Sequence, residues 1–323
     1  MIRFLARRTA EALVVLAAMS FAIYILIGLM PGDPIDLMIQ SDPRLTVADA
    51  QRLKALYGLD RPLVERYLTW AGAALSGDFG YSRVYARPVL DLLLPRLGNT
   101  ALLLGLSLLL SLAIALPLGI LAALKPYSRT DYIVNLVSFA GISVPPFWLA
   151  LLLMILFAVT LGWFPAGGME TVGDGGFADR AWHMALPVLT LTLASVGGFA
   201  RFMRASMLQT LRQDYIRTAR AKGVGTVRLV TGHALRNALM PLVTVVALSF
   251  GSLFSGALVT ETMFAWQGMG KMIYDAILGN DFNLALVGLL FATLTTLVGN
   301  MLADLAYVAL DPRITLTARE GAR

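Results

Sequence analysis

"TALLLGLSLLLSLAIALPLGILAAL", residues Thr100–Leu124, contains no charged side chain. A bilayer with a hydrocarbon core about 30 Å thick needs about 20 mostly apolar residues per crossing helix. A helix on the surface of a soluble core would instead carry charged residues on its wet face. This run therefore predicts a helix that spans a membrane.

Similar uncharged runs recur along the chain, which is 58% hydrophobic and only 14% charged. Soluble domains have about 25% charged residues, so a large soluble helical core is disfavoured. We predict an all-α polytopic membrane protein with six transmembrane helices at about 9–30, 99–123, 133–161, 184–204, 237–260 and 282–308. The first run follows three arginines but is longer than the usual signal-peptide core and lacks a cleavage site, so we expect it to remain uncleaved.

The distribution of Lys and Arg predicts the orientation, because short cytoplasmic loops are enriched in these residues. The N-terminus, the loop containing Lys125 and Arg129, and the stretch 201–236 are all basic, whereas the short loops on the other side lean acidic. Both termini are therefore expected in the cytoplasm. Membrane lipid is sufficient to explain the positive charge, and no nucleic-acid partner is required.

The chain divides at about residue 95. Residues 1–95 are expected to hold the first spanning helix (9–30) and a periplasmic helical region (31–95). That region contains one helix in "TVADAQRLKALYGLD" (46–60) and an amphipathic helix in "RPLVERYLTWAGAALSGDFG" (61–80). Residues 96–311 are expected to form a second domain that holds the other five spans, and 312–323 a cytoplasmic tail.

Chemistry-bearing residues are scarce. The absence of cysteine excludes disulfides and thiolate chemistry, and the central parts of the spans have no Asp, Glu, Lys or Arg. His183 and His233 lie at membrane edges without a paired ligand pattern, so structural roles are favoured over metal binding. "GMGK" (268–271) lacks the first glycine and the Ser or Thr of a phosphate loop. We predict no catalytic residue, metal or cofactor in this chain. An ion-coupled transporter is disfavoured because it would need a carboxylate at the midplane.

"YIRTARAKGVGTVRLVTGHALRNALMP", residues 215–241, is basic. The sequence predicts that a first helix runs out of the fourth span from Met207, that Gly223 and Gly225 break it, and that a second helix enters the fifth span at Pro241. Tyr215, Ala219 and Lys222 share one side of the first helix, and the small Ala219 and Ala221 would allow a partner to approach closely. Gly223 is expected to take a left-handed conformation that ends the helix. A rigid corner of this kind between two spans can transmit force.

This stretch resembles the cytoplasmic loop of ABC-importer permeases, whose pattern is Glu-Ala-Ala, three residues, Gly, nine residues and Ile-x-Leu-Pro. Here Arg217-Thr218-Ala219 stands before Gly223, so two of the three lead residues are changed, and so are the Ile and Pro. Motifs along Arg3–Ile314 are similar to those of the dipeptide, oligopeptide and nickel branch: "MPGDP", "YGLDRPL", "GDFGYS", "ISVPPFWLALLL", "LGWFPAGG", "HMALPVLTLTLA" and "ETMFAWQGMGKMIYDAILGNDFNLALVGLLF".

The resemblance implies a type I importer fold in the bacterial inner membrane and a subunit that is not itself an enzyme. The implied partners are a second homologous permease subunit, two cytoplasmic ATPase subunits that bind ATP and Mg, and a periplasmic substrate-binding protein. The loop 201–236 would couple to an ATPase. The resemblance assigns its contacts to Tyr215, Arg217, Thr218, Ala219, Ala221, Lys222 and Gly223.

Two questions stay open at the level of sequence. Pro145, Pro146 and Phe147 interrupt the third span and either shape a translocation path or provide a kink for packing. The substrate class is expected to be di- or oligopeptides, with glutathione, opines and nickel complexes as alternatives. A membrane scaffold without a transport path is a third class of function.

Overall fold

The computed structural model describes residues 2–29, 52 and 61–310, and the elements found there are helices. Five of them are long and apolar enough to cross a membrane, and a bent pair makes a sixth span if it is counted as one. The prediction of an all-helical polytopic membrane protein is confirmed. Apart from residue 52, the helix expected within 46–60 lies outside the described residues, and so does the tail 312–323.

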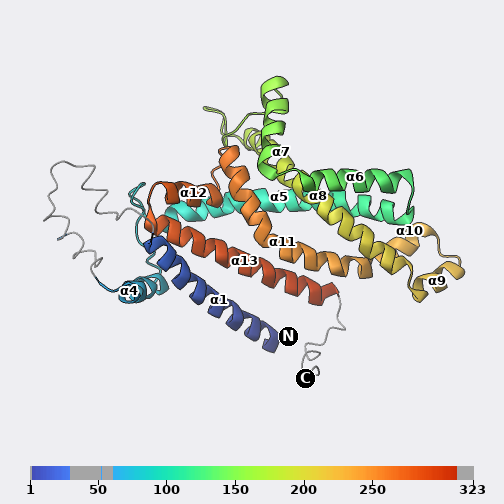
Figure 1. Cartoon of the computed structure of the whole chain (residues 1–323), viewed down its shortest axis with the longest axis horizontal. Helices are drawn as coiled ribbons and strands as arrows, with labels where there is room; N and C mark the ends of the chain where they lie inside the picture. The colour runs from blue at the N-terminus through green and yellow to red at the C-terminus, as the bar shows by residue number, and fades with distance from the viewer. Residues whose placement is uncertain (1, 30–51, 53–60, 311–323) are drawn as a thin grey trace. The chain divides into compact units, whose positions relative to one another are not determined.

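The described residues fall into two compact units. One, called the 100–267 unit, contains Thr100–Gln267 and continues from Thr296. The other, called the 2–99 unit, contains Ile2–Asn99 and Gly268–Thr295. The helices are drawn in Figure 1. They are α1 (Ile2–Gly28), α4 (Leu63–Leu75), α5 (Val89–Leu124), α6 (Arg129–Ser143), α7 (Pro146–Leu153), α8 (Phe177–Leu211), α9 (Asp214–Ala221), α10 (Thr226–Leu229), α11 (Leu235–Met263), α12 (Met269–Leu278) and α13 (Phe282–Leu310).

In the 2–99 unit, an aromatic cluster joins α1 to α4. The Tyr67 and Ser20 hydroxyls are 2.8 Å apart, and the Tyr67 ring packs edge-on against Phe21 and Tyr24. α4 is amphipathic, as the sequence predicts, and begins after Pro62. Apolar rings with a polar tip provide large contact areas while keeping their hydroxyls paired.

A buried carboxylate organises another part of the same unit. Asp281, which is 1% exposed, precedes α13 and accepts a hydrogen bond from the Leu284 amide, as a helix N-cap does. Its other oxygen accepts hydrogen bonds from the Ser82 hydroxyl at 2.5 Å and the Val84 amide at 3.0 Å. The turn 80–89 is thereby tied to the start of α13.

In the 100–267 unit, α8 packs against α6, α7 and α11 (Figure 1). Glycines on α8 and its neighbours allow very close contact. A Cβ at Gly197 would lie 2.5 Å from the Ser138 carbonyl oxygen of α6, and a Cβ at Gly119 of α5 would lie 2.7 Å from the Ala200 carbonyl oxygen of α8. Small residues of this kind let membrane helices approach at backbone distance.

The third span differs from the single helix expected over 133–161. α6 ends at Ser143, α7 begins at Pro146, and the chain bends by 101° between the two segments. α7 then continues as a π-helical stretch, Met154–Thr160. The cause is the proline pair, because Pro145 forces Val144 out of the helical region (ψ 120°) and Pro146 fits only the first turn of a new helix.

The close approach of α6 and α8 predicts a clear difference between two adjacent glycines. Gly197→Ala should destabilise the protein by about 1–3 kcal/mol, because the new methyl group overlaps the α6 backbone. Gly198→Ala is the matched control, since no heavy atom lies within 4 Å of its Cβ position. Thermal unfolding in detergent should show a lower Tm for the first variant only. An unchanged Tm for Gly197→Ala would contradict the close packing.

Candidate functional site

The stretch singled out in the sequence forms a compact helical loop between α8 and α11, residues 212–234, which we call the α8–α11 loop. It contains α9 and α10, which lie at the end of α8 (Figure 1). Asp214 in the first turn of α9 and Arg220 in the last turn complement the helix dipole. After α10, a π-helical turn, Val230–Ala234, leads into α11.

Gly223 ends α9 in the left-handed conformation predicted from the sequence, with φ +78°. The Gly223 amide donates to the Arg220 carbonyl at 3.0 Å, and the Val224 amide donates to the Ala219 carbonyl at 3.2 Å. This pair of bonds is the Schellman arrangement, which favours glycine at the left-handed position. The expectation of a fixed glycine corner is confirmed.

The inner face of the α8–α11 loop belongs to the core of the 100–267 unit. Ile216 is fully buried and Ala219 is 7% exposed. Both pack in one hydrophobic cluster with Met203 and Met207 of α8 and with residues of α11. The loop therefore has no separate core, and a displacement of α9 must move the ends of these helices.

This burial corrects one expectation about the surface of α9. Ala219 faces the core, so it cannot form a contact surface for a partner. The other residues expected on that surface are exposed: Tyr215, Arg217, Thr218, Ala221, Lys222 and Gly223. Of these, Tyr215 is also tied to α11, because its hydroxyl accepts a hydrogen bond from the Asn237 side-chain amide at 2.7 Å.

Two of the exposed residues bond within α9. The Thr218 hydroxyl donates to the Asp214 carbonyl at 3.0 Å, and Arg217 lies 3.6 Å from the Asp214 carboxylate. That ion pair is open to solvent on both sides, and surface pairs contribute little to stability. Arg217 can therefore leave the Asp214 carboxylate and pair with a carboxylate on another molecule at a small cost in free energy.

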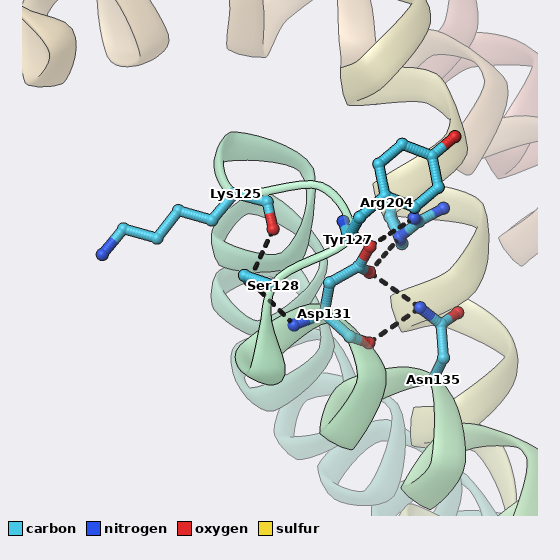
Figure 2. Close-up of polar contacts among 6 residues, drawn as sticks. All are labelled: Lys125, Tyr127, Ser128, Asp131, Asn135 and Arg204. Atoms are coloured by element: carbon cyan, nitrogen blue, oxygen red, sulfur yellow. Dashed lines mark hydrogen bonds and ion pairs between the residues drawn. The ribbon is translucent and has the colours of Figure 1, made fainter.

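A polar cluster that the sequence reasoning missed joins α6 to α8 (Figure 2). Figure 2 shows the Arg204 guanidinium pointing at the Asp131 carboxylate. Nε donates to one oxygen at 2.5 Å and Nη2 to the other at 2.6 Å. Asp131 also accepts bonds from the Tyr127 amide at 2.8 Å and the Asn135 side-chain amide at 2.7 Å. Ser128 caps α6 through the Asp131 amide.

The geometry of this cluster fixes both helices. A bidentate guanidinium–carboxylate pair is planar and directional, so it sets the rotation of α6 against α8 as well as their separation. The Asp131 side chain is 4% exposed and that of Arg204 is 22% exposed. The sequence carried one signal for Asp131, the spacing Ser-x-x-Asp that is typical of a helix start, but it carried none for its partner.

The residues Pro145, Pro146 and Phe147 lie at the bend between α6 and α7 and are exposed. The Pro145 carbonyl accepts bonds from the Trp148 and Leu149 amides at 3.0 Å each, so the new helix is capped from its first turn. α7 packs against α8 and α11. The three residues therefore lie at the start of a helix that packs against the spans on either side of the α8–α11 loop.

Among the described residues, no group of three or more His, Asp or Glu side chains is placed to hold a metal ion. His183 is buried and lies 3.5 Å from the Asp179 carboxylate, one helical turn earlier in α8. The exposed His233 lies in the π-helical turn before α11. The two histidines therefore occupy different ends of the unit.

Comparison with known proteins covers nearly the whole chain. A family model described as "Binding-protein-dependent transport system inner membrane component" matches residues 115–316, and the model of its N-terminal part matches residues 1–104. The oligopeptide transport system permease protein AppB of Bacillus subtilis is 39% identical, over 97% of this chain and 99% of its own length. The di/tripeptide transport system permease protein DppB of Pseudomonas aeruginosa is 36% identical over the same shares.

A solved structure gives the same fold. An inward-facing form of the MetNI methionine ABC transporter aligns with a TM-score of 0.56 at 18% identity. The alignment covers 69% of this chain and 97% of that one. The prediction of an ABC-importer permease fold is thereby confirmed.

The Asp131–Arg204 pair generates a stability prediction. Asp131→Asn should destabilise the protein by about 3 kcal/mol, because it leaves a partly buried guanidinium without its counter-charge. Asp214→Asn is the matched control, since its ion pair with Arg217 is exposed. Thermal unfolding in detergent should show a Tm lowered by several degrees for the first variant and nearly unchanged for the second. Equal Tm values would mean that the pair does not hold α6 to α8.

Proposed function

Since this chain belongs to the family of binding-protein-dependent transport system inner membrane components, we propose that it is a permease subunit of an ATP-driven importer of di- and oligopeptides. The observation that carries the peptide assignment is the likeness, over nearly the full length, to permeases named for oligopeptide and di/tripeptide transport. In this proposal the chain forms half of the translocation path.

The proposed assembly follows from the family. Its members work with a binding protein that delivers the substrate, here a periplasmic protein that binds peptides. A second homologous permease subunit supplies the other half of the path, as a hetero- or homodimer. Two cytoplasmic ATPase subunits bind ATP and Mg, so this chain needs no cofactor of its own. ATP binding provides the differential interaction that shifts the membrane subunits between two states.

The α8–α11 loop is the proposed contact with an ATPase subunit. Its exposed residues Tyr215, Arg217, Thr218, Ala221 and Lys222 form the surface, and Gly223 holds the corner. Ala219 and Ile216 act from inside, since they anchor the surface to α8 and α11. A surface anchored in this way transmits displacement, whereas a flexible loop would absorb it.

The proposed orientation places this loop and both chain ends in the cytoplasm, in accordance with the excess of Lys and Arg there. The residues Pro145, Pro146 and Phe147 are proposed to border the path, because a sharp bend exposes backbone that a straight span would hide.

Reporter fusions test the proposed orientation. A reporter fused after Arg220 should indicate a cytoplasmic location, and one fused near Ala73 should indicate a location outside the cell.

Other substrates of similar transporters are the first alternatives: glutathione, opines and nickel complexes. An ion-coupled secondary transporter belongs to a different class, and a membrane scaffold would have no path. Purification of the chain from its native membrane separates these classes, because only an importer subunit brings ATPases and a second permease with it.

The direct test is transport by the purified complex in proteoliposomes. We expect accumulation of L-alanyl-L-alanine that requires ATP and the binding protein together. The chain alone should neither bind nor hydrolyse ATP. Transport of a nickel complex or of glutathione in place of the dipeptide would overturn the substrate assignment. Transport driven by an ion gradient without ATP would overturn the class.

Gly223 provides a sharp test of the coupling surface. Gly223→Val should abolish ATP-dependent uptake and reduce co-purification of the ATPases, because a β-branched residue is strongly disfavoured at φ +78°. The spanning helices are unchanged, so membrane insertion should be normal.

Gly225→Val is the matched control for this test. Gly225 has φ −63°, which valine accepts, and neither glycine has a heavy atom within 4 Å of its Cβ position. Uptake by this variant should remain near normal. Near-normal uptake by Gly223→Val as well would show that the corner is not the coupling element.

A further inference from the structure

A polar groove lies where α8, α9 and α11 meet. Its volume is about 610 Å³, which falls within the range of small-molecule sites. Its lining residues are Ser206, Gln209, Thr210, Gln213, Tyr215, Asn237, Met240, Pro241 and Thr244. Seven of these nine side chains carry an amide or a hydroxyl group, and none is charged.

The lining follows the helical period on both walls. On α8 and just beyond it, Ser206, Gln209, Thr210 and Gln213 recur at i, i+3, i+4 and i+7, so they share one face. On α11, Asn237 and Thr244 are seven residues apart, with Pro241 between them. The Ser206 hydroxyl donates to the Ala238 carbonyl at 2.7 Å and thereby joins the two walls.

Seven of the nine lining residues belong to helices that qualify as membrane spans, Phe177–Leu211 and Thr226–Val246, whereas Gln213 and Tyr215 lie beyond these spans, in the α8–α11 loop. Thr244 lies nine residues beyond the start of α11, which is about 14 Å along the helix. The Ser206 and Thr244 hydroxyls bond to the carbonyl groups of Ala238 and Met240, but a face with several amide and hydroxyl groups is still costly against lipid, which offers no partner for their remaining donors and acceptors. A second groove, between α5 and α8, is lined only by apolar residues and has the composition expected of a lipid-facing surface.

The chemistry of the polar groove suits a peptide. Each amide side chain offers two donors and an acceptor, and each hydroxyl group offers both functions. These are the groups that a peptide backbone needs in exchange for its hydration water. The nine residues include no His, Asp or Glu, so the groove supplies no ligand that nickel prefers.

We propose that this groove is a water-filled section of the peptide path, in which neutral amide and hydroxyl side chains replace the hydration of the peptide backbone. The inference rests on the proposed function and names the residues that act in it. Tyr215 belongs both to the groove and to α9, and its hydroxyl is bonded to Asn237 on the opposite wall. Through this bond, a displacement of the α8–α11 loop is passed on to α11 at the groove.

The absence of cysteine from the chain makes the proposal directly testable. Thr244→Cys places a thiol in the groove. A second variant, Gln213→Cys, places a thiol at the loop end of the groove, and its labelling shows that the reagent has reached this end. Ile114→Cys is the matched control. Ile114 is an exposed apolar residue ten positions before the end of α5, about 15 Å along the helix, so its distance from the helix end is similar to that of Thr244.

The experiment uses the complete transporter in proteoliposomes, with a charged, membrane-impermeant methanethiosulfonate reagent on the ATPase side. Thr244→Cys should react at least about tenfold faster than Ile114→Cys, because an apolar surrounding raises the thiol pKa and each pKa unit lowers the thiolate fraction about tenfold. Modified Thr244→Cys should lose ATP-dependent transport of L-alanyl-L-alanine, and reagent-treated Ile114→Cys should keep it.

Three outcomes decide the proposal. Fast labelling with loss of transport supports it. Equal labelling of Thr244→Cys and Ile114→Cys overturns it, and places the polar face in a dry contact with the second permease. Fast labelling without loss of transport also overturns it, since the groove would then be wet but outside the path. Transport by the wild-type complex is measured first. If that complex does not transport the dipeptide, the result counts against the proposed function itself.

Discussion

The 100–267 unit depends on how closely its helices approach α8. Helices in a bilayer gain little from the hydrophobic effect against one another, so their association relies on van der Waals contact and interhelical hydrogen bonds. Gly119 and Gly197 provide that contact, because at each of them a neighbouring backbone occupies the place of a side chain. Once the backbones are this close, short polar links become possible, such as the Ser206 hydroxyl on the Ala238 carbonyl and Arg204 on Asp131.

The α8–α11 loop extends the same packing beyond the spans. Ile216 and Ala219 enter the cluster that contains Met203 and Met207, and Gly223 turns the chain so that Val224 can join it. Interiors packed in this way change between discrete arrangements and do not deform continuously. A loop built into such a core therefore moves together with the ends of α8 and α11.

Features encoded by neighbouring residues could be predicted from the sequence. Uncharged runs predict the spanning helices, and a glycine between two helical segments predicts the left-handed corner at Gly223. The proline pair predicts an interruption of the third span, but the two residues alone do not specify its 101° bend. The Asp131–Arg204 bond joins residues 73 positions apart, and no local pattern specifies such a pairing. The small size of Ala219 predicts a close contact, but size alone does not tell whether that contact is with a partner or with the chain's own core.

The charges of the 100–267 unit bear on how such a protein can be driven. A carboxylate that relays protons must change partners during the cycle, whereas Asp131 has its two oxygens bonded to a guanidinium, a backbone amide and a side-chain amide. Separating that pair would leave an uncompensated charge in the bundle, so its geometry suits packing. Glu261 is fully buried near the end of α11 and accepts a hydrogen bond from Thr100 of α5, which again links two helices. The polar groove, in contrast, is neutral, and Tyr215 joins it directly to the loop. In this arrangement a mechanical displacement of the loop can act on the groove without any change of charge inside the bundle.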